Sequence, residues 1–168
     1  MQMFDKFGEF NSAEELNMAA EGLLKEGDTK SLKELAEENG IEIEDVEDYI
    51  AGDTDQLATL SMAAYGRLNV LENQEIASLK NQIEKMPLAV IMQMLKGMAT
   101  EQDMQKAIMT KGKRLTSIYA AMRDAAEKHK SGSIGVACGT DRELCNIIKA
   151  YYTESDKDFK KKISNLYR

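Results

Sequence analysis

Proline occurs only once in the 168 residues, at position 87, so very little in this chain interrupts a hydrogen-bonded helix. Apolar residues recur at helical spacing in one segment after another, and eleven methionines supply adaptable core side chains. The hydrophobic content of 43% is enough for a core, in which aliphatic residues must dominate because aromatic residues make up 6%. These features predict an all-α protein.

Two short helices joined at Asn39-Gly40 are predicted within residues 31–52, and the apolar face of the second is expected to consist of Ile43, Val46 and Ile50. The order Ala36, Gly40, Val46 is the spacing of a helix-turn-helix. In that motif a small residue lies where the helices cross, glycine takes the left-handed turn, and a branched residue lies under the second helix. On spacing alone, this pair would indicate DNA binding.

The charge of the same stretch argues against that function. Residues 34–66 contain ten acidic residues and no lysine or arginine. Affinity for duplex DNA depends on cations that displace counterions, and this surface has none to offer. The pair is therefore either a purely structural unit or an acidic surface for a basic partner. Its candidate contact residues are Glu42, Glu44, Asp45, Glu47 and Asp48.

Charge divides the whole chain into two parts. Residues 1–60 hold seventeen acidic and four basic residues, a net charge of −13, whereas residues 61–168 hold twelve acidic and eighteen basic residues, a net charge of +6. The two parts can neutralise each other by folding together, or present opposite surfaces to one large partner. We expect an acidic N-terminal helical module, 1–52, packed beside a larger basic bundle with a short C-terminal helix, 53–168.

The basic part contains a second candidate surface, for contact with nucleic acid or nucleoprotein. Lys113 and Arg114 lie beside a predicted glycine turn, where their cations could grip phosphates. The full set of candidate basic residues is Lys106, Lys111, Lys113, Arg114, Arg123, Lys128 and Lys130. The alternative is that these are solvated helix faces.

The middle of the chain gives less definite boundaries. Asp53 or Thr54 is predicted to cap a helix that continues to residue 86, either whole or in two parts, and Pro87 to begin the next helix. The run 88–98 is apolar almost all round and too short to span a bilayer. It predicts a buried central helix or an interface between two copies of the chain.

Several other signals are local. Ser12 with Glu15 and Thr140 with Glu143 have the spacing of capping boxes, and Thr100 with Asp103 repeats the cap signal before a helix near 101–110. At the N-terminus the aromatic residues predict a segment that staples the chain end to the core, with a partner-docking peptide as the alternative. Those residues are Phe4, Phe7 and Phe10.

The residue types needed for catalysis or metal binding are scarce. The only histidine, His129, is expected at a helix end, and Cys138 and Cys145 cannot complete a four-ligand zinc set. The glycine-rich loop 131–139 lacks the lysine of a phosphate-binding loop. We therefore expect a binding protein and not an enzyme, with no cofactor and no metal. Two cysteines and an N-terminus without an apolar signal segment predict a cytoplasmic location, away from membranes.

Residues 4–52 resemble the N-terminal signature of a family of small proteins from phages, plasmids and integrative elements of Clostridia-type Firmicutes. The resemblance rests on Phe4-Asp5-Lys6-Phe7, Glu9-Phe10, Ser12-Ala13-Glu14-Glu15, Leu35-Ala36, Asn39-Gly40 and Glu44-Asp45-Val46 with Asp48-Tyr49. Further along, Lys111-Gly112-Lys113 and Tyr151-Tyr152 fit in the same order. The family includes anti-CRISPR proteins that inhibit the type II RNA-guided DNA nuclease.

The resemblance implies non-catalytic binding to such a nuclease, or to its complex with guide RNA, in the cytoplasm of a bacterial host. The acidic helix pair would replace phosphates in a positively charged channel, and the basic part could touch guide RNA or DNA. Two other functions stay open. One is a mobile-element regulator that binds DNA or RNA through residues 106–130, and the other is a helical adaptor or dimerisation module.

Overall fold

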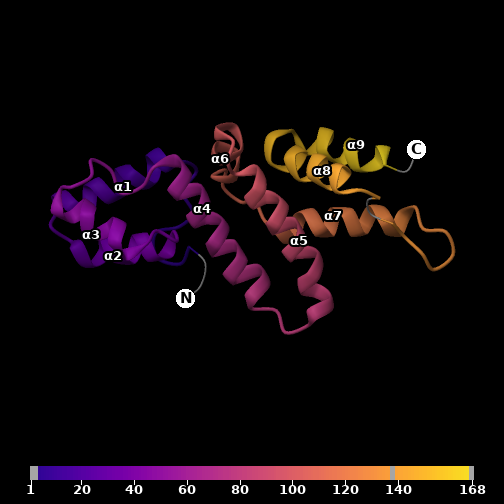
Figure 1. Ribbon diagram of the computed structural model, residues 1–168, viewed down its shortest axis with the longest axis horizontal. Helices are drawn as coiled ribbons and strands as arrows, with labels where there is room; N and C mark the ends of the chain where they lie inside the picture. Colours follow the sequence, from indigo (N-terminus) through magenta and orange to yellow (C-terminus); the bar gives the residue numbers. More distant parts are fainter. Residues whose placement is uncertain (1–3, 137–138, 167–168) are drawn as a thin grey trace.

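The all-α prediction is confirmed. The computed structural model describes residues 4–136 and 139–166, and these residues form nine α-helices and one π-helical segment but no strand (Figure 1). The helices are α1 Ala13–Lys25, α2 Thr29–Glu38, α3 Ile43–Ala51, α4 Leu60–Leu71, α5 Gln82–Met98, α6 Gln102–Ile108, α7 Leu115–Lys128, α8 Asp141–Thr153 and α9 Asp156–Asn165, and the π-helical segment is η1 Glu72–Ala77.

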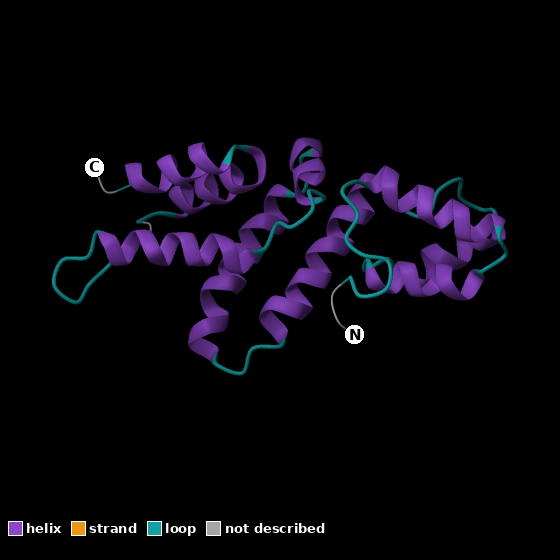
Figure 2. Ribbon diagram, turned by 180° about the vertical axis from the view of Figure 1, so that it is seen from behind, coloured by secondary structure: helices purple, strands orange, loops and turns teal. Residues whose placement is uncertain are grey.

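The helices lie in three groups along the length of the molecule (Figures 1 and 2). Helices α1–α3 form one end, α4 and α5 form a V in the middle, and α7–α9 form the other end. Within the part of the chain that the structure describes, no helix combines the length and the apolar character that crossing a membrane would require.

The N-terminal helices form as predicted. The Ser12 side chain accepts a hydrogen bond from the Glu15 amide (3.2 Å) and begins α1, but the Glu15 carboxylate accepts from the Asn11 amide (2.7 Å), so the predicted capping box is only half formed. At the turn between α2 and α3, Gly40 has a φ of 67°, and Ala36 and Val46 are buried on either side of it. The helix-turn-helix spacing therefore describes how these two helices pack.

One detail of α3 was predicted wrongly. The apolar face was expected to include Ile43 and Ile50 with Val46. Ile50 is half-buried and packs against the N-terminal hydrophobic residues, but Ile43 is exposed. Tyr49 takes the place of Ile43 and is buried with Val46. The three-residue step from Val46 to Tyr49 keeps both side chains on the face that meets α1 and α2.

The helix expected from Asp53 or Thr54 begins instead at Leu60, with Thr59 as its cap (Met62 amide to Thr59 Oγ1, 3.2 Å). Residues 53–59 are irregular, and two of them, Leu57 and Ala58, are buried. Asn17 of α1 holds this segment by bonding both backbone groups of Ala58, at 2.8 and 3.0 Å. A helix there would lose these bonds.

The question of one helix or two between residues 54 and 86 is settled as two, separated by η1 and a break at 78–81. Pro87 does not begin a helix, because α5 starts at Gln82 with the Asn81 side chain accepting from the Ile83 amide (2.9 Å). Pro87 therefore lies inside α5.

Thr100 does not cap α6, contrary to the prediction. Its hydroxyl bonds the Gly97 carbonyl (3.3 Å), and the N-cap is Glu101.

The run 88–98 was expected to be buried all round, but only one face of it is buried. Leu88, Ile91, Met92 and Leu95 point into the core, whereas Val90, on the opposite side of α5, is exposed. The helix is therefore a central core element on one face and a surface element on the other.

Two hydrophobic clusters divide the molecule, and they meet inside α4. Ala63 belongs to the N-terminal cluster and Ala64 to the larger C-terminal cluster. The N-terminal cluster also takes one residue from the far half of the chain, Met109. The capping box Thr140–Glu143 opens α8 as predicted, and Phe159 and Ile163 anchor α9 in the larger cluster.

Candidate functional site

The five predicted acidic contact residues all lie on or next to α3. Four of the five side chains are exposed and the fifth, Asp45, is half-buried. Only Glu47 has an ion pair within the described residues, with Lys33 of α2 at 3.4 Å. Glu42 is the N-cap of α3, and Glu44 and Asp45 lie in its first turn. There they complement the helix dipole, which favours negative charge at this end.

Other acidic residues of the module are used inside the fold. Glu38 is buried and accepts hydrogen bonds from the backbone amides of Lys6 and Phe7, each at 3.1 Å. The Lys6 side chain forms an ion pair with Glu34. These contacts strap the N-terminal segment along α2, and they remove Glu34 and Glu38 from the acidic surface.

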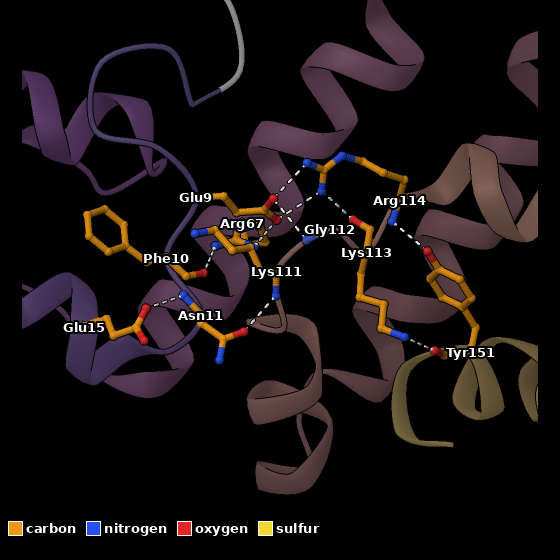
Figure 3. Close-up of polar contacts among 10 residues, drawn as sticks. All are labelled: Glu9, Phe10, Asn11, Glu15, Arg67, Lys111, Gly112, Lys113, Arg114 and Tyr151. Atoms are coloured by element: carbon orange, nitrogen blue, oxygen red, sulfur yellow. Dashed lines mark hydrogen bonds and ion pairs between the residues drawn. The ribbon is translucent and has the colours of Figure 1, made fainter. Parts of the chain in front are cut away.

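The predicted basic turn is also used inside the fold (Figure 3). Lys113 donates from Nζ to the Tyr151 carbonyl (2.6 Å) and lies over the Tyr151 ring, 4.5 Å from its centroid. The backbone amide of Arg114 donates to the Tyr151 hydroxyl (3.0 Å). The Lys113 cation and the Arg114 backbone amide therefore hold the turn against α8, and the Lys113 cation is engaged within the fold in this arrangement.

Arg114 is part of a buried network that includes two residues not predicted to matter, Glu9 and Arg67. Arg114 forms two bonds to the Glu9 carboxylate (3.0 and 2.8 Å), and Arg67 approaches Glu9 at 2.6 Å. The side chain of Arg67 is 2% exposed and that of Glu9 is 8% exposed. The Phe4 ring lies 4.8 Å from the Arg67 guanidinium carbon. We call Glu9, Arg67 and Arg114 the buried ion network.

Burial works against the charged form of Glu9, but its partners outweigh it. The hydrogen bond from Arg114, the charge of Arg67 and the amide of Gly112 (3.1 Å) together lower the pKa of Glu9 below its ordinary value. Burial lowers the pKa of Arg67, and the Glu9 bonds raise the pKa of Arg114. The network therefore stays charged at neutral pH.

A signal for Arg67 was present in the sequence. It lies at helical spacing from buried Ala64 and Leu71, so it falls on the core face of α4. A buried arginine needs a carboxylate partner. The sequence does not show which carboxylate pairs with Arg67, because Glu9 lies 58 residues away along the chain.

A second buried carboxylate, Glu75 of η1, lies near this network. One of its oxygens accepts from the Thr116 amide (2.9 Å), and the other, Oε1, has no hydrogen-bond partner among the described residues. The hydroxyl of buried Tyr152 is likewise unpartnered within the described residues, and burial raises the pKa of this tyrosine.

The remaining predicted basic residues are spread over α6, α7 and the segments that follow them. Lys106 is on α6 and Lys111 is exposed at the turn, while Arg123 lines a groove of about 340 Å³ between α5 and α7. Lys128 faces a different hollow, between α7 and α9, which Lys160 also lines. At the end of α7, Lys130 pairs with Glu127.

The described residues considered for chemistry lie on different elements. Among the described residues, no three histidine, cysteine or acidic side chains are grouped so as to hold a metal ion. His129 follows α7, and Cys145 is a half-buried free thiol on α8. Cys138 lies outside the described residues.

Comparison with known proteins gives no assignment. No protein-family model matches the chain, and no curated protein or solved structure matches it.

Proposed function

We propose that this chain is a non-catalytic binding protein that inhibits a type II RNA-guided DNA nuclease, with the acidic face of α3 as its contact surface. The supporting observation is the set of carboxylates along α3. Of the five, only Glu47 has an ion pair within the described residues, and four are exposed.

Helical geometry makes these carboxylates one anionic surface. Glu44 lies three and four residues from Glu47 and Asp48, so their Cβ atoms are about 5–6 Å apart. Like charges at this spacing each cost a few tenths of a kcal/mol in the free protein. A cationic partner removes that cost, so the fold binds such a partner more favourably than it would if each acid had a lysine beside it.

An RNA-guided nuclease offers a partner of the required sign, because positively charged channels hold its guide and target strands. An acidic helix in such a channel competes with phosphates. The choice of this nuclease, among all cationic partners, rests on the resemblance of residues 4–52 described above.

The test is charge reversal. A variant with Glu44, Asp45, Glu47 and Asp48 changed to lysine should lose inhibition of guided DNA cleavage by type II effectors, while circular dichroism shows that the helices remain. A matched control reverses four exposed acids on other elements, Glu26, Glu84, Asp103 and Asp124, and should still inhibit. Equal inhibition by both variants would remove α3 from the mechanism, and no inhibition by the unaltered protein would remove the function.

A second candidate function has one observation in its favour. Lys128 and Lys160 line the same hollow and neither has an ion pair with the described residues, although Asp124 also lines it. A nucleic-acid-binding regulator could use these lysines. A gel-shift titration on bare DNA and RNA against salt separates the two. The inhibitor should show no shift without the nuclease, whereas a regulator should bind with a steep salt dependence that Lys128→Glu weakens.

A further inference from the structure

Helix α5 carries apolar side chains on the side that faces solvent. Ile83 is 79% exposed, Met86 is 60% exposed and Val90 is 46% exposed. Gln93 and Gly97 continue the same line and are exposed as well. The positions 83, 86, 90, 93 and 97 are separated by alternating steps of three and four residues. We call this line the α5 stripe.

The stripe lies opposite the buried face of the same helix, which carries Leu88, Ile91, Met92 and Leu95. Alternating steps of three and four residues mark the seam of two paired helices, because they keep one line of side chains facing a partner. Exposed apolar side chains grouped in this way usually mark an interaction surface. The α5 stripe is therefore suited to packing against another helix.

We propose that two copies of this chain pair through the α5 stripe, with the two α5 helices antiparallel. A two-fold axis at Val90 brings Val90 of each copy together. It also places Ile83 of one copy against Gly97 of the other, and Met86 beside Gln93, which lies one residue nearer the axis.

The shape of the stripe favours this direction of pairing. A Cβ atom built on Gly97 would meet nothing within 4 Å, so open space adjoins this glycine. In the antiparallel pair the large Ile83 side chain of the second copy fills that space. A parallel pair would instead set Ile83 against Ile83 and leave two glycines facing each other across a void.

Charge also permits a second copy. Residues 86–95 contain no charged side chain, so the contact sets no like charges against each other. Lys85 and Lys96 border this run on its two sides, and Lys96 is already bonded to Glu72 of its own chain (2.5 Å). A stripe of this length, about 21 Å at 1.5 Å per residue, buries less than the roughly 1,200 Å² typical of stable complexes. The dimer should therefore be reversible and depend on concentration.

Sedimentation velocity over a range of micromolar concentrations tests the proposal. The unaltered chain should move from its monomer mass of 18.8 kDa towards twice that mass as the concentration rises. Val90→Glu should remain monomeric at every concentration, because it sets two carboxylates together on the two-fold axis. The matched control, Met18→Glu, alters another exposed methionine site, 71% exposed on α1, and should dimerise like the unaltered chain.

Three results would overturn the proposal. The first is a monomer at all concentrations, and the second is a dimer that Val90→Glu leaves intact. The third is a monomeric chain whose binding to the nuclease is abolished by Val90→Glu, because the α5 stripe would then dock another protein. Circular dichroism checks that the variant folds. If it does not, Met86→Lys tests the same contact at a more exposed position. The dimer and the proposed inhibition are independent, so either can fail alone.

Discussion

The backbones of two glycines, Gly40 and Gly66, approach closely in the N-terminal half. A Cβ atom on Gly66 would lie 2.4 Å from the Asn39 carbonyl oxygen, and one on Gly40 would lie 2.5 Å from the Gly66 carbonyl oxygen. The turn between α2 and α3 therefore rests directly on α4. Glycine is needed at position 40 for two reasons, the left-handed φ of the turn and the close approach to Gly66. Only the first can be predicted from the neighbouring sequence.

Gly66→Ala should lower the free energy of unfolding by about 2 kcal/mol, because the turn must move away from α4 to admit a methyl group. Gly22→Ala is the control, since it is also a helical glycine but nothing lies within 4 Å of its added Cβ. It should raise stability by about 1 kcal/mol through helix propensity. Urea denaturation measures both, and a similar change in the two variants would contradict the contact.

The buried ion network predicts a pH dependence. The pKa of Glu9 is lower in the folded chain than its ordinary value of 4.5. Its contribution to stability is therefore complete above that value, and it is lost as the pH falls from 4.5 through the lowered pKa. Glu9→Gln should cost about 3 kcal/mol at neutral pH, because two arginines lose their carboxylate.

The measurement is urea denaturation at several pH values between neutral and acidic. The unaltered chain should lose stability more steeply than Glu9→Gln on acidification, so that the two curves converge. Parallel curves would mean that Glu9 does not carry the acid sensitivity of the fold.

At the scale of helices, the sequence predicted what is decided locally. Capping at Ser12 and Thr140 depends on residues three positions away, and the complete box was predicted correctly at Thr140. At Ser12 only the cap itself forms, because the Glu15 carboxylate accepts from the Asn11 amide. The start of α4 could not be read in this way. Asp53, Thr54 and Thr59 are all acceptable caps, and the choice is made by Asn17, which holds Ala58 from 41 positions away.

The candidate site shows the same limit. The exposed acids of α3 were predictable, because charged residues at helical spacing opposite an apolar face must meet solvent. The role of Arg114 could not be predicted, because its partner Glu9 is 105 residues away in the sequence. A basic turn looks the same in sequence whether its cations serve a ligand or the fold.

Pro87 gives a prediction at this scale. It is the sixth residue of α5, so its missing amide leaves the Ile83 carbonyl without a helical donor. Pro87→Ala should raise the free energy of unfolding by about 1–2 kcal/mol, after allowing for the greater freedom of the unfolded chain. Thermal and urea unfolding measure this gain. Leu88→Ala, one residue on but buried, should instead cost about 3 kcal/mol.

At the scale of the whole molecule, the two hydrophobic clusters are joined by more than α4. Ile108 and Met109 are neighbours in the chain and both are buried, yet Ile108 belongs to the C-terminal cluster and Met109 to the N-terminal one. This pair therefore tests how the clusters are connected.

Met109→Ala and Ile108→Ala should each cost about 3 kcal/mol, but in different places. Hydrogen exchange should quicken first in α1–α3 for Met109→Ala, and first in α7–α9 for Ile108→Ala, because each truncation loosens the cluster that it leaves. The same exchange pattern in both variants would show that the clusters behave as one core.

The bonds from Glu9 to Arg114 also set an order of events during synthesis. Ribosomes release a chain from its N-terminus, and α1–α3 can assemble early because their contacts are close in sequence. Glu9 can pair with Arg67 as soon as α4 has emerged, but its bonds to Arg114 must wait until 105 residues after Glu9 have been made. A nascent chain stalled before residue 114 should therefore hold the segment around Glu9 less firmly than the finished chain does, and should lose it to proteases more readily.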